Sequence, residues 1–342
     1  MKQPSPSVAA VPGSLTFTVL RLLADGEFHS GEKLARRLGM SRASVHNALQ
    51  SVGDYGLTLH RVRGRGYRLV HPPQWLDARR IVEYLGKQAG EFHLEILDSA
   101  ASSNTLLLQR ARQEGALSGS VLAVEWQSGG RGRMGRVWHS GLGNALTCSL
   151  LWRFEQGLSA LSGLSLAASV ALIRALRRLD IAGAQLKWPN DVMSGEGKLA
   201  GILVEAHGDI LGPSAVVIGI GINLSLPQAT AARIDQPASC LATLTDALPD
   251  RNRLLAVLLD ELGGVLRNFA TTGFAALRTE WESYHALQDQ PVRLLLPDGK
   301  KTSGIARGVT DAGALRVETS RGMQTFNAGE ISLRRGGNHA AD

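Results

Sequence analysis

Positive charge is concentrated in the first fifth of this chain. Residues 1–72 carry 10 Lys and Arg against 4 Asp and Glu, whereas residues 73–342 carry 27 against 26, which gives the total net charge of +7. A segment this different from the rest is expected to be a separate folding unit with an anionic partner, either a nucleic acid or a membrane surface. The full length of 342 residues leaves room for one or two further domains.

The basic segment has the pattern of a winged helix-turn-helix. Apolar residues recur at helical spacing at Leu15, Val19, Leu22 and Leu23. Ser30 and Ser41 stand where helix caps belong, and Gly39 ends the helix between them. Strands are expected at 57–62 and 67–70, and the glycines of the Arg-Gly-Arg-Gly link between them permit a tight hairpin turn. This hairpin would be the wing.

The third helix of this unit, expected from Arg42 to about Val52, would enter the major groove of DNA. The residues expected to contact base edges and phosphates there are Ser41, Arg42, Ser44, His46 and Asn47. Arginines in the wing would contact phosphates, and these are Arg61, Arg63, Arg65 and Arg68. The alternative is a basic winged helix that contacts another protein. Specific DNA binding would need a dimer on two half-sites, because one unit contacts few bases.

Several classes of protein are excluded. No run approaches 18 apolar residues, and the first residues lack the apolar stretch of a signal peptide. Cys148 and Cys240 form neither a metal-binding spacing nor a disulfide framework. We therefore expect a cytoplasmic location and no membrane partner, with Cys148 as a small buried residue rather than a nucleophile.

The remaining chain predicts an α/β (α+β) fold in two more units. Strands are expected at 121–126, 145–152, 199–207 and 215–224, and helices at 161–179 and 253–269. From 291 to 333, short alternating strands separated by turn sequences predict a small SH3-like β-barrel. The expected organisation is a disordered tail at 1–13, a winged helix-turn-helix at 14–72, a central mixed-sheet domain at 78–284 and a C-terminal domain at 285–335.

A glycine–arginine loop at residues 130–135 is the first indication of chemistry. It matches the GxGxxG pattern of dinucleotide-binding folds, but residues 136–143 do not begin a helix, so a Rossmann site is not predicted. Glycines let the backbone approach a ligand closely, and Arg131, Arg133 and Arg136 can pair with phosphate or carboxylate. An exposed basic turn is the alternative.

Three further segments strengthen the prediction of an anion site. Residues 187–191 read Lys-Trp-Pro-Asn-Asp, which combines a cation, an aromatic ring, an amide and a carboxylate. Lys198 begins an apolar strand and could reach into a cavity. Residues 219–223 read Gly-Ile-Gly-Ile-Asn, a strand whose alternate glycines leave room for a ligand against the backbone.

Together these segments resemble the biotin protein ligase family, in the bifunctional bacterial form that is also the biotin operon repressor. The resemblance extends from about residue 15 to 335, and the motifs stand in the family's order and spacing. The closing Gly-Glu-Ile-Ser-Leu-Arg at 329–334 matches the family's C-terminal signature. The resemblance implies a winged helix, a central ligase domain and an SH3-like barrel.

The resemblance also implies which residues bind biotin and the adenylate. They are Ser102, Ser103, Asn104, Gln127, Arg131, Gly132, Arg133, Trp138, Lys198, Gly201, Leu203, Gly221, Asn223 and Arg334. Among these, Lys198 and Arg133 would be the catalytic cations, and Arg334 would lie near the adenine end. The chain departs from the family pattern in having Ser103 in place of threonine and Met134 in place of a common arginine. The family's aromatic lid over adenine has no clear match near 234–238.

The implied reaction has two steps. The carboxylate of biotin attacks the α-phosphorus of ATP to give biotinyl-5′-AMP and pyrophosphate, and a lysine of a biotin carboxyl carrier protein then displaces AMP. The enzyme must align two anions and neutralise developing charge, so no enzyme nucleophile is needed. Mg²⁺ is expected with ATP, with Asp191 as its candidate ligand. The same adenylate would act as corepressor by favouring a homodimer on operator DNA.

Three alternatives remain open from the sequence. A ligand-sensing regulator that has lost ligase activity is disfavoured by the retained Lys198, Arg131 and Arg133. A ligase whose winged helix no longer binds an operator is disfavoured by the basic wing. A lipoate or octanoate ligase shares the central fold, but the glycine–arginine loop favours biotin.

Overall fold

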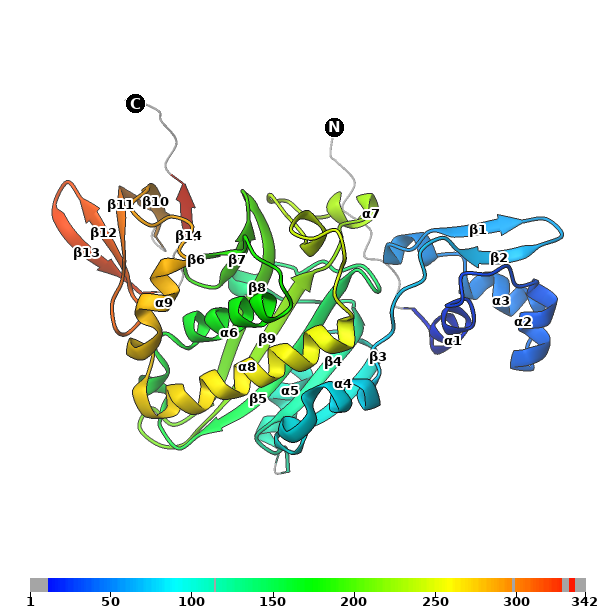
Figure 1. Cartoon of the computed structure of the whole chain (residues 1–342), viewed down its shortest axis with the longest axis horizontal. Coiled ribbons are helices and arrows are strands. Elements are labelled where there is room, and N and C mark those ends of the chain that lie inside the picture. Colours follow the sequence, from blue (N-terminus) through cyan, green and yellow to red (C-terminus); the bar gives the residue numbers. More distant parts are fainter. Residues whose placement is uncertain (1–11, 114, 297–298, 328–331, 336–342) are drawn as a thin grey trace.

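The structure is a computed structural model that describes residues 12–113, 115–296, 299–327 and 332–335. Three groups of elements follow one another along its length, with the blue amino-terminal helices at one end and the orange and red strands at the other (Figure 1). The mixed α/β architecture predicted from the sequence is confirmed. Among the described residues, no helix is both long enough and apolar enough to cross a bilayer. Most of the tail expected at 1–13 lies outside the described residues.

The amino-terminal group is a winged helix. Its elements are α1 (Ser14–Leu22), α2 (Gly31–Leu38), α3 (Arg42–Ala48), the 3₁₀ turn η1 (Val52–Tyr55), β1 (Leu59–Val62) and β2 (Gly66–Leu69). The Ser30 side chain accepts a hydrogen bond from the amide of Lys33 and so caps α2, while Gly39 takes the left-handed conformation (φ 63°) that ends it. β1 and β2 pair antiparallel to form the wing. The third helix ends at Ala48, four residues before the expected Val52.

The central group is a seven-stranded mixed sheet in the order β3-β4-β5-β9-β8-β7-β6. Its strands are β3 (His93–Ala100), β4 (Ser120–Gln127), β5 (Ala145–Phe154), β6 (Gln185–Lys187), β7 (Asp191–Ser194), β8 (Gly197–Gly208) and β9 (Ser214–Asn223). The helices and 3₁₀ turns are α4 (Ala78–Leu85), η2 (Gly86–Glu91), α5 (Ser103–Arg112), η3 (Arg133–Gly135), η4 (Leu158–Leu161), α6 (Leu164–Arg178), α7 (Gln228–Ala231), η5 (Leu241–Thr243), α8 (Arg251–Thr272), η6 (Ala275–Leu277) and α9 (Arg278–Ser283). Among the described strands of this sheet, β3 and β4 pair parallel and the other neighbouring pairs are antiparallel.

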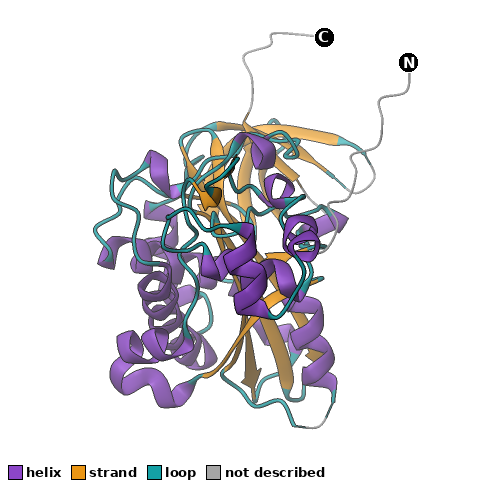
Figure 2. Ribbon diagram, turned by 90° about the vertical axis from the view of Figure 1, so that its right-hand side faces the viewer, coloured by secondary structure: helices purple, strands orange, loops and turns teal. Residues whose placement is uncertain are grey.

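The sheet is buried on both faces, and helices lie on either side of its strands (Figure 2). Alternate residues of β9 point in opposite directions, because the side-chain period of a strand is two. Val216 and Ile218 belong to the core with α6 and α8, whereas Ala215 and Val217 pack with α5 on the other face. This alternation also directs Gly219 and Gly221 toward the α5 face.

The C-terminal group is a five-stranded antiparallel sheet in the order β13-β12-β11-β10-β14. Its strands are β10 (Pro291–Leu295), β11 (Lys301–Val309), β12 (Leu315–Thr319), β13 (Gly322–Phe326) and β14 (Ser332–Arg335). Within the described residues no pairing of β13 with β14 closes the sheet into a barrel. The buried Val292 and Leu315 of this sheet continue the core of α6 and α8.

Candidate functional site

The floor of the site is two rows of residues that cross the central sheet. Strand pairing places Ser149 and Leu203 on either side of Gly219, and it places Thr147 and Gly201 on either side of Gly221. Thr147, Gly201, Leu203, Gly219 and Gly221 line a cavity of about 440 Å³. Because glycine has no side chain, the sheet is hollowed at the centre of both rows.

Eleven of the residues that the sequence predicts for biotin and adenylate line this first cavity. They are Ser102, Ser103, Asn104, Gln127, Arg131, Gly132, Trp138, Lys198, Gly201, Leu203 and Gly221. Segments that lie more than a hundred residues apart in the sequence therefore meet in one place. Cys148 also lines the cavity, and burial raises the pKa of its thiol to about 12, so it is a buried thiol as the sequence predicts.

Gly219 and Gly221 of β9 leave space for two side chains that form the wall of the cavity. A Cβ on Gly221 would lie 2.5 Å from Cε2 of Trp138, and a Cβ on Gly219 would lie 2.2 Å from Oδ1 of Asn104. The sequence predicts that these glycines admit a ligand against the backbone. In the structure they admit the ring of Trp138 and the amide of Asn104, which form the cavity wall.

A buried hydrogen-bond network holds the polar end of the first cavity. The Ser149 hydroxyl lies 2.6 Å from Oδ1 of Asn104 and 2.7 Å from Oγ of Ser103, and the amide of Ser103 donates to Oε1 of Gln127 at 2.7 Å. Nδ2 of Asn104 donates to Oε2 of Glu205 at 3.0 Å. Since each hydrogen bond fixes a neighbour, the network presents a prearranged set of donors and acceptors to a polar ligand.

Sequence reasoning missed Ser149 and Glu205. Ser149 lies in the largely apolar strand β5 and is fully buried. A buried hydroxyl needs a hydrogen-bond partner, and this is the signal that could have identified it. Glu205 carries a carboxylate that binds both Asn104 and Arg131, so it ties the glycine–arginine loop to the polar end of the cavity.

Two cations, Arg131 and Lys198, line the first cavity and a third, Arg133, lines the neighbouring one; each has a partner within the chain. Nζ of Lys198 lies 2.5 Å from Oδ1 of Asp191, and Arg131 forms an ion pair with Glu205. Arg133 donates to Oδ1 of Asn190 at 3.3 Å. Burial lowers the pKa of Arg133, and the neighbouring Asp191 only partly offsets this, so an incoming anion would stabilise the guanidinium.

Two further cavities adjoin the first. A cavity of about 670 Å³ lies between the glycine–arginine loop, the Lys-Trp-Pro-Asn-Asp segment and Leu333 of the C-terminal sheet, and Arg133 lines it. A third cavity of about 350 Å³ is lined by Asn223 and by residues 234–236. Lys198 and Trp138 line all three cavities and therefore lie where they meet. The side chain of Arg334 lies outside the part that the structure describes.

The Lys-Trp-Pro-Asn-Asp segment is positioned by the C-terminal sheet. The buried indole of Trp188 donates to the carbonyl of Gly313, in the turn between β11 and β12, at 3.0 Å. Asn190 donates to the carbonyl of Ile202 at 2.7 Å and thus binds β8 beside the first cavity. The C-terminal group therefore supports one wall of the second cavity.

The second candidate site is a groove between α3 and the wing. Arg42, His46, Asn47, Arg61 and Arg63 are among the residues that line it. The hydroxyls of the other two predicted residues of this helix, Ser41 and Ser44, lie 2.9 Å apart, and the Ser41 side chain accepts from the amide of Ser44 to cap α3.

The wing arginines make different contacts, although the sequence predicts phosphate contacts for all of them. Nη2 of Arg61 donates to the carbonyl of Leu49 at 2.6 Å, just past the end of α3, so this side chain stabilises the helix. The guanidiniums of Arg65 and Arg68 lie over the ring of Phe28, with 4.1 and 4.9 Å to the ring centre. Arg63, at the tip of the wing, is exposed.

The described residues contain no cluster of three or more His, Cys, Asp or Glu side chains that could hold a metal ion. Asp191, the residue predicted to meet Mg²⁺, is paired with Lys198. This donor set does not fit a magnesium site built by the protein alone.

Three family profiles match the chain. The Biotin/lipoate A/B protein ligase family matches residues 97–223, the Biotin protein ligase C terminal domain matches residues 289–334, and an HTH domain matches residues 16–68. The three matches follow the same order as the three groups of elements in the structure.

Known relatives match most of the chain. The bifunctional ligase/repressor BirA of Salmonella typhimurium is 39% identical over 94% of this chain and 98% of its own length, and that of Escherichia coli is 39% identical over 92% and 96%. The biotin–[acetyl-CoA-carboxylase] ligase of Mycobacterium tuberculosis is 33% identical over 77% of this chain and 96% of its own.

Among solved structures, biotin protein ligase from Aquifex aeolicus in complex with biotin and ATP superposes with a TM-score of 0.60. It is 27% identical and covers 71% of this chain and 99% of its own. The matched sequence families, the relatives and this structural similarity agree with the resemblance stated from the motifs. The chain belongs to the biotin protein ligase family, in the bifunctional form that combines a ligase with a repressor.

Proposed function

We propose that this protein is an ATP-dependent ligase that forms biotinyl-5′-AMP and transfers biotin to a lysine of a biotin carboxyl carrier protein. The observation that carries the proposal is the position of Lys198, at the junction of three cavities and close to Arg131 and Arg133. A ligase that joins a carboxylate to a phosphate needs a cation at the point where the two anions meet. The relatives named above support biotin and ATP as the substrates.

In the first step, an oxygen of the biotin carboxylate forms a bond to the α-phosphorus of ATP while the bond to pyrophosphate breaks. Lys198 would release Asp191 and stabilise the negative charge that builds up around the phosphorus, and Arg133 would assist from the second cavity. In the second step, the amine of the acceptor lysine attacks the carbonyl carbon, loses a proton and expels AMP.

We propose that the polar network of the first cavity binds the ring end of biotin. Asn104, Ser103 and Ser149 offer amide and hydroxyl groups, which can pair with the polar atoms of a cyclic urea, while Trp138 offers an apolar wall. The remaining predicted residues keep the roles that the resemblance implies, including Asn223 in the third cavity. We also expect Mg²⁺ to accompany ATP.

We also propose that the same chain represses transcription of biotin-synthesis genes. The groove between α3 and the wing would bind operator DNA, with Ser41, Ser44, Arg42, His46 and Asn47 on the helix and Arg63 and Arg65 on the wing. Operator binding by one winged helix is weak, so we expect adenylate-bound chains to pair on a site with two half-sites. We also propose that the protein is cytoplasmic and that its three domains span residues 14–72, 78–284 and 285–335.

The ligase proposal is tested with the purified full-length chain, biotin, ATP and a biotin carboxyl carrier domain. We expect biotin to be attached to the carrier only when ATP is present, and not to a carrier whose acceptor lysine is changed to arginine. Labelling with lipoate or octanoate in place of biotin would contradict the assigned substrate. No labelling with any of the three acids would contradict the enzyme itself.

The repressor proposal is tested with a duplex from the promoter of the source organism's biotin-synthesis genes. We expect the chain to bind this duplex more tightly when biotin and ATP are both present, and to bind a scrambled duplex of equal length weakly under both conditions. Equal binding of both duplexes would contradict specific repression.

A further inference from the structure

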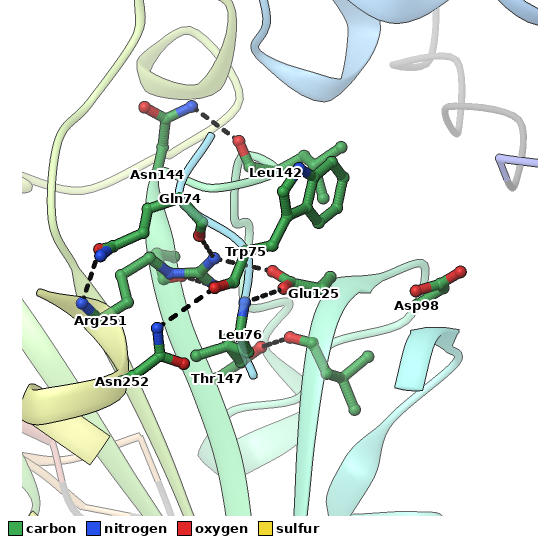
Figure 3. Close-up of polar contacts among 12 residues, drawn as sticks. Gln74, Trp75, Leu76, Asp98, Glu125, Leu142, Asn144, Thr147, Arg251 and Asn252 are labelled. Atoms are coloured by element: carbon green, nitrogen blue, oxygen red, sulfur yellow. Dashed lines mark hydrogen bonds and ion pairs between the residues drawn. The ribbon is translucent and has the colours of Figure 1, made fainter. Parts of the chain in front are cut away.

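A short linker joins the winged helix to the ligase sheet, and a buried ion pair holds it in place. Residues 73–77 form this linker, between β2 and α4. Arg251, the first residue of α8, is only 2% exposed, and its Nη1 lies 2.8 Å from Oε2 of Glu125 in β4 (Figure 3). Its Nη2 donates to the carbonyl of Ala145 at 3.0 Å, and its backbone amide donates to Oε1 of Gln74 at 2.8 Å.

The linker backbone bonds to the same cluster. The amide of Leu76 donates to Oε1 of Glu125 at 2.7 Å, and the amide of Asp77 donates to Oδ1 of Asn252 at 2.7 Å. Nδ2 of Asn252 donates to the carbonyl of Trp75 at 3.3 Å (Figure 3). We call Glu125, Arg251 and Asn252 the clamp. Each residue from Gln74 to Asp77 bonds to the clamp, so the linker follows one fixed path.

The clamped linker is also the surface on which the first helix of the winged helix rests. The ring of Trp75 meets the ring of Phe17 in α1 edge-on, with 6.4 Å between centres, and the guanidinium of Arg21 lies 4.5 Å from its ring centre. Arg21 in turn pairs with Asp98 of β3. The orientation of α1 therefore depends on where the clamp holds Trp75.

Three consecutive residues of β4 connect the linker, the winged helix and the ligand cavity. Glu125 belongs to the clamp, Trp126 packs edge-on against Tyr55 of the winged helix with 5.5 Å between ring centres, and Gln127 lines the first cavity. Gln127 accepts the hydrogen bond from Ser103 described above. A movement of Gln127 on ligand binding would therefore take place next to Trp126, which contacts the winged helix, and two residues from Glu125, which belongs to the clamp.

The start of β5 makes a second connection of this kind. Arg251 bonds to the carbonyl of Ala145, and the preceding Asn144 donates to the carbonyl of Gly56 at 3.4 Å, while the amide of Leu142 donates to the carbonyl of Tyr55 at 2.8 Å. Residues 142–145 follow closely after Trp138, which lines all three cavities. The clamp therefore holds both segments, 125–127 and 142–145, that connect the lining of the cavity with the winged helix.

We propose that Glu125 and Arg251 are a positioning pair that holds the winged helix in the orientation required for operator binding and makes that orientation depend on the ligand in the cavity. Neither side chain lines the ligand cavities, so the pair acts on DNA binding rather than on the chemistry of biotin transfer. This inference rests on the proposed function, since it assigns a role in the regulation of the same site.

The test uses the full-length double variant Glu125→Leu/Arg251→Met. Replacing both partners with apolar groups avoids leaving one charge buried and unpaired. The matched control is Glu91→Gln/Arg267→Met, because Arg267 is an exposed residue of the same helix α8 whose ion pair with Glu91 does not touch the linker. Biotin transfer to the carrier domain and binding to the promoter duplex are measured for both variants with biotin and ATP present.

We expect the clamp variant to transfer biotin within about threefold of the unmodified chain and to bind the promoter duplex at least about tenfold more weakly than the control variant. Duplex binding equal to that of the control would overturn the proposal. So would a parallel loss of both activities in a protein whose circular dichroism shows it to be folded. Failure of the unmodified chain to transfer biotin or to bind the duplex would instead contradict the proposed function.

A measurement on the unmodified chain keeps the proposal testable if the clamp variant does not fold. Hydrogen exchange of the Leu76 and Asp77 amides reports how often the clamp opens. We expect both amides to exchange at least about 100-fold more slowly than in a peptide of the linker sequence, and more slowly still when biotin and ATP are added. Unprotected amides, or exchange that the ligands leave unchanged, would overturn the inference.

Discussion

The ligand cavity and the groove between α3 and the wing both use cations, but they hold them differently. Around the cavity, Lys198 and Arg131 are paired with carboxylates of the chain, and Arg133 is half-buried. In the groove, Arg63 is exposed to solvent. Cations that take part in a chemical step are prearranged and partly desolvated, which strengthens their effect on a small anion. An exposed cation such as Arg63 stays hydrated until a polyanion arrives.

The largest effect is expected from Lys198→Ala. Loss of the cation at the junction of the cavities should lower adenylate synthesis by about 10²–10³-fold, because its charge would stabilise the transition state. ATP–pyrophosphate exchange in the presence of biotin measures this step. Lys87→Ala removes an exposed lysine far from the cavities and should leave the rate unchanged. Normal exchange in Lys198→Ala would remove this residue from the mechanism.

Arg133→Gly should affect retention of the adenylate more than its formation. A charged hydrogen bond contributes about 1.5–3 kcal/mol, so we expect the adenylate to leave the site about 10- to 100-fold faster. The rate at which biotinyl-5′-AMP appears in solution, separated from the protein by rapid filtration, measures the loss. A variant that retains the adenylate as long as the parent does would contradict the role of Arg133.

His285 extends the comparison to a buried imidazole, whose protonation costs free energy because the charge would be desolvated. Burial lowers the pKa of this imidazole to about 4, and its ring stacks on Trp281 with 4.7 Å between centres. Below pH 6.5 the unfolded chain therefore binds a proton that the folded chain does not, and stability falls as the pH drops from about 6.5 toward 4.

For the same histidine, we expect the free energy of unfolding to fall by about 2 kcal/mol from this residue between pH 7 and pH 5. Urea unfolding at the two pH values measures the change. His285→Phe preserves an aromatic ring against Trp281 and should reduce the pH dependence by that amount. An unchanged pH dependence in this variant would show that His285 is protonated in the folded state.

Gly221→Ala should raise the KM for biotin by about tenfold, since a Cβ 2.5 Å from Trp138 forces the ring into the cavity. Gly53→Ala in the winged helix is the matched change in the other region, because no atom lies within 4 Å of its Cβ and its φ is not positive. It should leave the KM unchanged. Steady-state biotin transfer measures both variants, and equal KM values would show that Trp138 moves away at little cost.

The smallest effect is expected from Arg63→Ala. It should weaken binding to the promoter and scrambled duplexes alike by a few-fold and reduce the salt dependence of log K by about one unit, as for a single phosphate contact. Fluorescence anisotropy at several salt concentrations measures both. Arg61→Ala should instead lower the thermal stability of the winged helix, because Arg61 bonds to the carbonyl of Leu49. A change of sequence preference in Arg63→Ala would contradict a phosphate contact.

Local features of the fold could be predicted because the interactions behind them lie within a few residues. The caps at Ser30 and Ser41, the left-handed Gly39 and the hairpin of the wing all appear where the sequence places them. The glycine–arginine loop contains a single 3₁₀ turn from Arg133 to Gly135, in agreement with the rejection of a Rossmann site. Helix ends were predicted less well, since α3 stops where Arg61 of the wing meets its end.

The sequence alone determined the mixed fold, the winged helix and the motifs that identify the family. Only the tertiary structure decided that Arg61 stabilises a helix, that Glu205 connects Asn104 to Arg131, and that Arg251 pairs with Glu125. Glu125 and Arg251 lie 126 residues apart. A polar side chain far from its partner in sequence looks the same whether it faces water or a buried counter-charge, and strand order and helix packing determine which of the two it meets.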